Sequence, residues 1–156
     1  MAQQTINIGA APNDDTGDDL RTGGQKINDN FTELYGMAGG SGSPFDIPVS
    51  YAGGPPTTGE ILYAVVVPRT LELAADLAGS YGYIGTNPTA SFAISVQDDG
   101  TEIGTITISA AGAFTFATDG GTAKTVAAGS RLEFVAPVTV DTTAAYILAT
   151  LAGAVG

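Results

Sequence analysis

Carboxylate side chains are the groups in this sequence most capable of chemistry, and Asp98 and Asp99 are an adjacent pair of them. A catalytic pair faces its substrate from two sides, with the two carboxyl groups about 5 to 9 Å apart in glycosidases. Neighbours at the tip of a turn point outward instead. Asp98-Asp99-Gly100 stands between two strand-like segments, so it predicts a hairpin turn rather than an acid/base site.

The densest acidic group lies near the N-terminus and comprises Asp14, Asp15, Asp18 and Asp19. Its spacing lacks the alternate ligands and the twelfth-position Glu of an EF-hand loop, so it does not predict a calcium site. Carboxylates at the start of a helix face unpaired N–H groups and the positive end of the helix dipole. We therefore expect Thr16 to cap a helix, with Asp18 and Asp19 in its first turn.

Histidine and cysteine are both absent. Their absence excludes Ser-His and Cys-His nucleophiles, disulfides and thiolate zinc sites. Sixteen acidic and five basic residues give a net charge of −11, which repels phosphate backbones and anionic membranes. No apolar run is long enough to span a membrane and no signal peptide is recognisable. The composition predicts a protein that is not an enzyme and has no cofactor, metal, nucleic-acid or membrane partner.

Tyrosines offer a different chemistry, since their rings have apolar faces and a polar edge on which a sugar can stack. Tyr81 and Tyr83, in a segment from 80 to 90 that reads as a loop, are the best candidates for contact with a glycan. Packing in a core or interface is the alternative explanation for them.

The segment from about 18 to 35 is the only one with a helical period. Leu20, Ile27, Phe31 and Leu34 recur at spacings of seven, four and three, which places them on one stripe of an α-helix. Gly23 and Gly24 each cost on the order of 1 kcal/mol relative to Ala, so the helix alone is marginal. Two partners remain open for its stripe: copies of itself, or the β domain of its own chain.

A distinctive string surrounds this helix: Ile6-Asn7-Ile8-Gly9, Asn13-Asp14-Asp15-Thr16-Gly17-Asp18, Leu20-Arg21-Thr22, Lys26-Ile27-Asn28, Asn30-Phe31 and Glu33-Leu34-Tyr35. These residues resemble the N-terminal segment of structural proteins in tailed-phage virions, especially tail fibres and tail appendages. Asp15 departs from that pattern, which usually has Gly at this position. The resemblance implies a virion protein with a site of assembly at this end, and the lack of a recognisable signal peptide predicts that it is made in the host cytoplasm. It also implies a homotrimer, because such fibres are usually trimeric.

The chain divides by composition into residues 1–35, an attachment arm and oligomerisation helix; residues 36–44, a Gly/Ser linker; and residues 45–156, a β domain. Ile6 and Ile8 alternate with polar residues over 2–9, which predicts a short strand that docks on the sheet edge of a neighbouring protein. A frayed terminus is the alternative for that arm.

Strand-like segments separated by Gly, Pro, Asn and Asp fill the region after residue 44. Their spacing of about 8 to 12 residues predicts a mainly β fold with an antiparallel, jelly-roll-like sandwich. The apolar run from 61 to 67 predicts a central strand that is buried on both faces. This region also resembles a β module of phage structural proteins, in Ala74-Ala75-Asp76-Leu77-Ala78-Gly79-Ser80, Gly85-Thr86 and Asn87-Pro88-Thr89-Ala90.

We therefore expect a phage virion structural protein: a tail fibre, or an appendage of the tail, baseplate or neck. Its arm docks on other virion proteins, and its β-sandwich is displayed. Two alternatives remain, a capsid decoration or head-fibre protein, and a carbohydrate-binding module that recognises a host-surface glycan.

Overall fold

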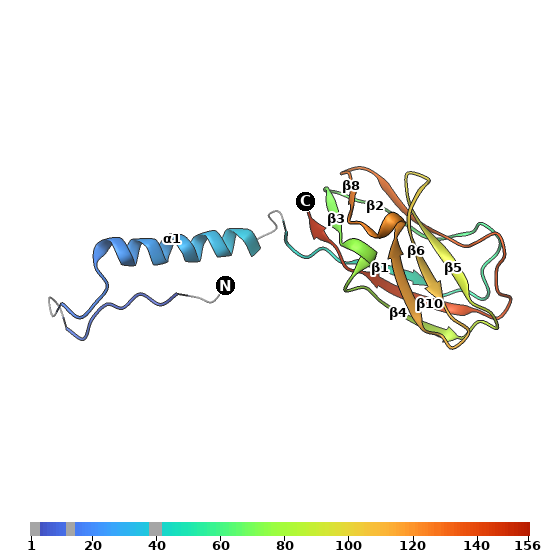
Figure 1. Ribbon diagram of the computed structural model, residues 1–156, viewed down its shortest axis with the longest axis horizontal. Coiled ribbons are helices and arrows are strands. Elements are labelled where there is room, and N and C mark those ends of the chain that lie inside the picture. The colour runs from blue at the N-terminus through green and yellow to red at the C-terminus, as the bar shows by residue number, and fades with distance from the viewer. Residues whose placement is uncertain (1–3, 12–14, 38–41) are drawn as a thin grey trace. The chain divides into compact units, whose positions relative to one another are not determined.

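The computed structural model describes residues 4–11, 15–37 and 42–156 of the chain. The chain divides into two compact units, Met1–Ser43 and Pro44–Gly156. The first contains an extended arm and the helix α1 (Leu20–Met37), and the second contains the strands (Figure 1). No helix within the described residues is long and apolar enough to cross a membrane.

Helix α1 begins later than the sequence predicts, because Asp19 and not Thr16 is its cap. The backbone N–H of Thr22 donates to Asp19 Oδ1 at 2.7 Å, as an N-cap requires, and this bond, followed by that from the Thr22 side chain, lowers the pKa of Asp19. Asp18 lies outside the first turn because its backbone and its carboxylate both bind the arm. At the other end, Gly36 and Met37 of the expected linker belong to α1, and residues 38–41 lie outside the described residues.

Residues 44–156 form three sheets whose strand pairs are all antiparallel. Their orders are β1-β10-β4, β11-β3-β8 and β2-β9-β5-β6-β7. The strands are β1 (Ile47–Tyr51), β2 (Ile61–Val66), β3 (Leu71–Leu73), β4 (Tyr81–Thr86), β5 (Phe92–Asp98), β6 (Thr101–Ile108), β7 (Phe114–Thr118), β8 (Lys124–Val126), β9 (Arg131–Val135), β10 (Ala145–Leu151) and β11 (Ala154–Val155).

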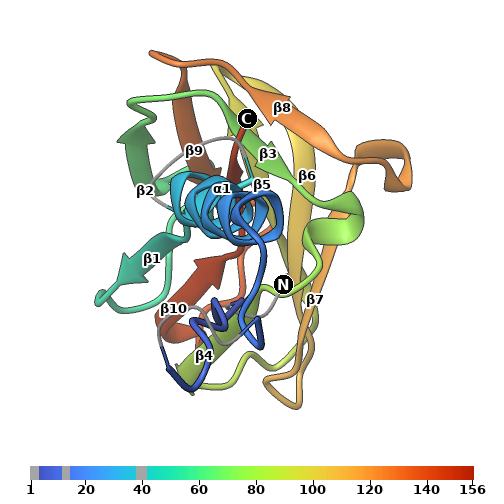
Figure 2. The same cartoon turned by 90° about the vertical axis from the view of Figure 1, so that its left-hand side faces the viewer.

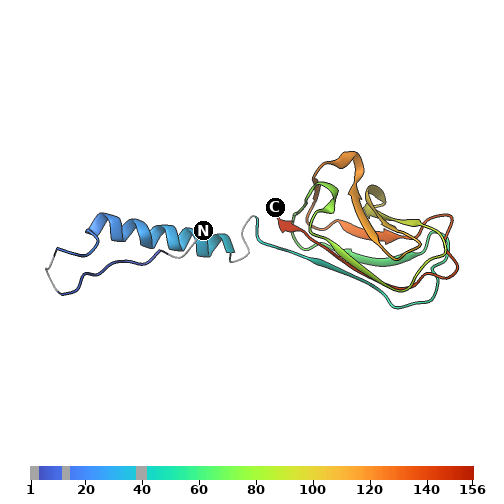
Figure 3. The same ribbon diagram turned by 60° about the horizontal axis from the view of Figure 1, so that its bottom comes forward.

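One hydrophobic core joins the three sheets. Leu71 of β3, Phe134 of β9 and Leu151 of β10 are each completely buried in it, although they come from different sheets. Figure 2 shows β1, β10 and β4 on one side of this body and β6 and β7 on the other, and Figure 3 shows the strands enclosing its interior. The predicted β-sandwich with one helix is therefore confirmed.

The hairpin predicted at Asp98-Asp99-Gly100 is also confirmed. Strands β5 and β6 pair antiparallel, and Asp99 and Gly100 adopt φ of 47° and 84° at the turn between them. Two successive positive φ values are those of a type I′ turn, which favours Asp-Gly. Asp99 Oδ1 accepts the N–H of Arg131 at 3.0 Å, so this carboxylate supports the turn.

Two predictions about strands are wrong. The segment from 61 to 67 contains β2, which lies at the edge of its sheet and leaves Ile61 and Val66 more than half exposed. A short apolar run does not specify a position in a sheet, and a bulge between Ile61 and Tyr63 interrupts the alternation of this one.

The segment from 80 to 90 is not all loop, because β4 occupies Tyr81–Thr86. Gly82 and Gly85 lie in this strand, and each glycine gives room to an aromatic ring. A Cβ on Gly82 would overlap the ring of Phe114, and one on Gly85 would lie 3.0 Å from Tyr146 Cβ. Strand glycines often mark such close approaches.

Asp141 ties the connection before β5 to the connection before β10. Its Oδ2 accepts the N–H and hydroxyl of Thr89 and the N–H of Ala90. Its Oδ1 accepts the N–H and hydroxyl of Thr143 and the N–H of Ala144. Six donors thus converge on one carboxylate that is only 8% exposed. The hydroxyls of Thr143 and Thr89, with the backbone N–H groups, hold the pKa of Asp141 far below its ordinary value.

Candidate functional site: the N-terminal arm and helix

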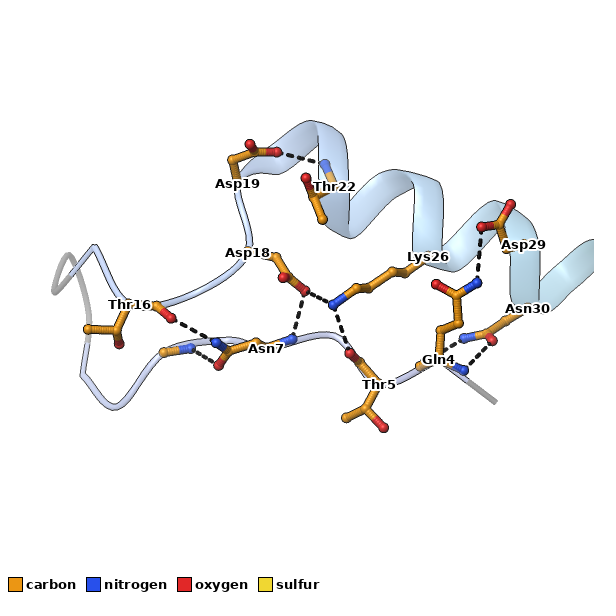
Figure 4. Close-up of polar contacts among 11 residues, drawn as sticks. Gln4, Thr5, Asn7, Thr16, Asp18, Asp19, Thr22, Lys26, Asp29 and Asn30 are labelled. Atoms are coloured by element: carbon orange, nitrogen blue, oxygen red, sulfur yellow. Dashed lines mark hydrogen bonds and ion pairs between the residues drawn. The ribbon is translucent and has the colours of Figure 1, made fainter. Parts of the chain in front are cut away.

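The arm runs back along α1; its beginning is bonded to the helix, and its end is bonded to the residues that precede the helix (Figure 4). At its beginning, the N–H of Gln4 donates to Asn30 Oδ1 and Asn30 Nδ2 donates to the carbonyl of Gln4, both at 2.9 Å. Gln4 Nε2 also donates to Asp29 Oδ2 at 3.1 Å. A side chain of the helix therefore satisfies the backbone of Gln4, and the arm forms no strand in residues 4–9.

Asp18 and Lys26 form the centre of this contact. Lys26 Nζ lies 2.7 Å from Asp18 Oδ2 and 3.2 Å from the carbonyl of Thr5, to which it donates. The N–H of Asn7 donates to the same Asp18 oxygen at 2.9 Å. The hydrogen bond from Lys26, followed by that from Asn7, lowers the pKa of Asp18. We call Asn7, Asp18, Lys26 and Asn30 the polar latch.

Asn7 also closes the turn between the arm and the helix. Its carbonyl accepts the N–H of Asp18 at 2.7 Å, and its Nδ2 donates to the carbonyl of Thr16 at 2.7 Å. Its Oδ1 accepts the N–H of Gly9 at 3.0 Å. In the same turn Asp15 adopts φ of 57°, a left-handed conformation that Gly tolerates best and Asp better than most other residues. The departure from the expected Gly is therefore accommodated.

Gly17 has no room for a side chain where the arm crosses it. A Cβ there would lie 2.9 Å from the carbonyl oxygen of Asn7 and 3.0 Å from the nitrogen of Gly9, both backbone atoms. We expect Gly17→Ala to detach the arm and to raise the amide hydrogen-exchange rates of residues 5–9 at least tenfold. Gly24→Ala is the matched control, since a Cβ on Gly24 meets nothing within 4 Å. Unchanged exchange in Gly17→Ala would contradict the closed turn.

The predicted apolar stripe lies open on α1. Leu20 is 95% exposed, and Ile27, Phe31 and Leu34 are each about half exposed. Ile27, Asn30, Phe31 and Leu34 line a shallow groove of about 250 Å³. The rings of Phe31 and Tyr35 stack with their centroids 6.3 Å apart.

The arm lies on the neighbouring face of the helix and leaves the stripe uncovered. Its bonds go to Lys26, Asp29 and Asn30, and the side chain of Ile6 lies at Gly23, 3.7 Å from the position of an added Cβ. At about 100° per residue Lys26 and Asp29 are set apart from the stripe around the helix, whereas Gly23 and Asn30 adjoin its edge, and Asn30 also lines the groove. The two proposed docking residues consequently differ: Ile6 is 36% exposed and Ile8 is 89% exposed.

Other candidates from the sequence serve structural roles or lie elsewhere. Asp18 and Asp19 are used in the latch and the cap, and Asp14 lies outside the described residues. Tyr81 and Tyr83 lie on β4 of the C-terminal unit and are exposed. Sequence reasoning missed the polar latch, because hydrogen bonds between an arm and a helix have no periodicity. The four latch residues do belong to the segment that resembles phage structural proteins.

Comparison with known proteins agrees with the resemblance to phage structural proteins. A family described as bacteriophage T4 gp9/10-like protein, N-terminal, matches residues 3–153. Over 43 residues, 28% of this chain, the sequence is 54% identical to the baseplate wedge protein gp10 of Enterobacteria phage T4. The matched residues amount to 7% of that relative. No solved structure gives a significant match. Because the family match extends over nearly all of the sequence, this chain belongs to the bacteriophage T4 gp9/10-like N-terminal family and is a component of the virion.

Proposed function

We propose that this protein is a non-enzymatic appendage of the phage tail or baseplate that trimerises through α1 and docks through its arm. The observation that carries the proposal is the apolar stripe, which the arm leaves exposed beside a polar latch. The relative in phage T4 is named a baseplate wedge protein, which supports a place in or near the baseplate.

Self-association would stabilise a helix that is only marginally stable alone. The spacing of Leu20, Ile27, Phe31 and Leu34 fits the d, d, a and d positions of heptads, with Gly24 at another a position. Complete burial of one such apolar side chain is worth roughly 1.5 to 3 kcal/mol. Burial of the stripe between copies therefore offsets the low helix propensity of Gly23 and Gly24.

The arm supplies a separate docking element in this proposal. Ile8 is almost fully exposed, whereas hydrogen bonds from the N–H groups of Asn7 and Gly9 hold the backbone on either side of it. An extended segment with one projecting aliphatic side chain suits a pocket or a sheet edge of a neighbouring virion protein. The polar latch thereby fixes the orientation of Ile8 relative to the stripe.

Incorporation into particles tests the arm. We expect Ile8→Asp to lower the copy number of the protein on purified virions at least tenfold, because a carboxylate would be buried without a partner. The trimer mass of the purified protein should not change. Val138→Asp, at another exposed aliphatic residue, is the control and should be incorporated normally.

Undiminished incorporation of Ile8→Asp would reject the docking arm. Imaging of particles that carry a labelled subunit tests the location. Label on the capsid instead of the tail would favour the decoration or head-fibre alternative.

A further inference from the structure

We propose that the outer face of β4 and β10 binds a neutral glycan through a row of three tyrosines, Tyr81, Tyr83 and Tyr146, here called the tyrosine face. Alternate side chains of a strand point to the same side, so Tyr81 and Tyr83 share one face of β4. They are 78% and 60% exposed. Opposite them on β10 lie Thr150 and Leu148 in register.

Gly85 is the next position on this face, and the ring of Tyr146 takes its place. The pairs Ala145–Thr86 and Ile147–Ile84 set Tyr146 opposite Gly85. A Cβ on Gly85 would lie 3.0 Å from Tyr146 Cβ and 3.2 Å from its Cδ1. Three rings therefore follow one another along β4, over a strand length of about 13 Å between residues 81 and 85.

The backbone of Tyr146 is strained, and its N–H donates to the carbonyl of Gly53 at 3.1 Å. Its φ is 58°, a left-handed conformation that is an outlier for a bulky residue and costs about fivefold to more than a hundredfold in the folding equilibrium. The ring gains little burial in return, because Tyr146 remains 47% exposed. Strain of this kind is concentrated at ligand-binding positions. Here the strained backbone of Tyr146 places a third ring beside those of Tyr81 and Tyr83.

The chemistry around the rings selects the class of ligand. A hollow of about 230 Å³ is lined by Tyr81, Gly82, Tyr83, Leu148, Ala149 and Thr150, and none of these is an acidic or basic residue, although the chain carries a net charge of −11. Aromatic faces with hydroxyl groups at their edges match the C–H faces and hydroxyl rim of a pyranose. A second protein copy would need an interface of roughly 800 Å² on each side with an apolar centre. Among the residues that line this hollow, Leu148 is the one large aliphatic side chain, so the face does not suit such an interface.

Affinity electrophoresis of the full chain in native gels that contain dextran, galactomannan or laminarin tests the proposal. We expect at least one of these neutral polymers to retard the protein. Tyr81→Ala and Tyr83→Ala should each weaken retardation about tenfold, the effect of removing one stacking ring. Tyr35→Ala, at an exposed tyrosine of α1, is the matched control and should be retarded like the original chain.

Tyr146→Gly separates binding from packing. Glycine adopts the positive φ without strain, so we expect weaker retardation with a melting temperature that is no lower than that of the original chain. Retardation by none of the three polymers would overturn the proposal, as would retardation that survives both Tyr81→Ala and Tyr83→Ala. Retention on poly-L-proline alone would assign the face to a peptide instead. Ile27→Asp alters the proposed trimer interface but leaves the tyrosine face unchanged. Retardation of this variant by the polymers therefore tests glycan binding separately from trimerisation.

Discussion

Ile27→Asp and Phe31→Asp, each tested alone, are expected to reduce the protein from a mass of three chains to that of one chain, 15.6 kDa. Both residues are only half exposed in the single chain and lie at the centre of the apolar groove of α1. In a trimer, three such carboxylates, one from each chain, would be buried close together around one axis. An unpaired buried charge costs several kcal/mol. Light scattering coupled to gel filtration measures the mass directly.

Gln25→Asp is the control for this experiment. It places the same side chain at another exposed position of α1, off the stripe, and should leave the mass unchanged. If Ile27→Asp and Phe31→Asp retain the mass of the original chain, the stripe is not the interface. A mass of one chain for the original protein would reject the trimer itself.

Asp141→Asn is expected to lower the melting temperature of the β domain by roughly 10 °C. The substitution keeps the shape of the side chain but replaces one acceptor oxygen by an NH₂ group. Each carboxylate oxygen receives three donors, so one set of three would face another donor instead of an acceptor. Buried donors without partners are costly because water no longer satisfies them. Differential scanning calorimetry measures the shift.

The pH dependence of the same variant gives an independent check. The pKa of Asp141 in the folded chain lies well below the ordinary value of 3.8, so the unfolded chain takes up this proton first as the pH falls. The stability that Asp141 contributes is therefore complete above about pH 5 and decreases as the pH falls below about 4. The melting temperatures of the original chain and Asp141→Asn should converge in that range.

Asp119→Asn, at an exposed acidic residue of the same unit, should leave the melting temperature unchanged at neutral pH. A constant difference between the original chain and Asp141→Asn down to pH 2 would contradict the assigned role of the carboxylate.

The sequence determined the elements whose signal is local. The spacing of Leu20, Ile27, Phe31 and Leu34 located α1 and its stripe, because helical periodicity requires no partner to be recognised. Asp98-Asp99-Gly100 located a hairpin for the same reason, since its turn needs two positive φ values that Asp and Gly allow. The regular recurrence of strand-like segments, which include β5 and β6, indicated the mainly β class.

Tertiary structure alone decided what depends on a partner that is distant in the chain. Gly82 and Gly85 resemble turn residues until Phe114 and Tyr146 are seen to need their space, and this hid β4 and the face it forms. The apolar run of β2 did not reveal that it lies at a sheet edge. Asp141 joins Thr89 across 52 residues, and Lys26 reaches Thr5 across 21, contacts for which sequence spacing has no signal. Periodicity indicates which face of a segment is buried, whereas the residues that pack against that face are determined only when the chain folds.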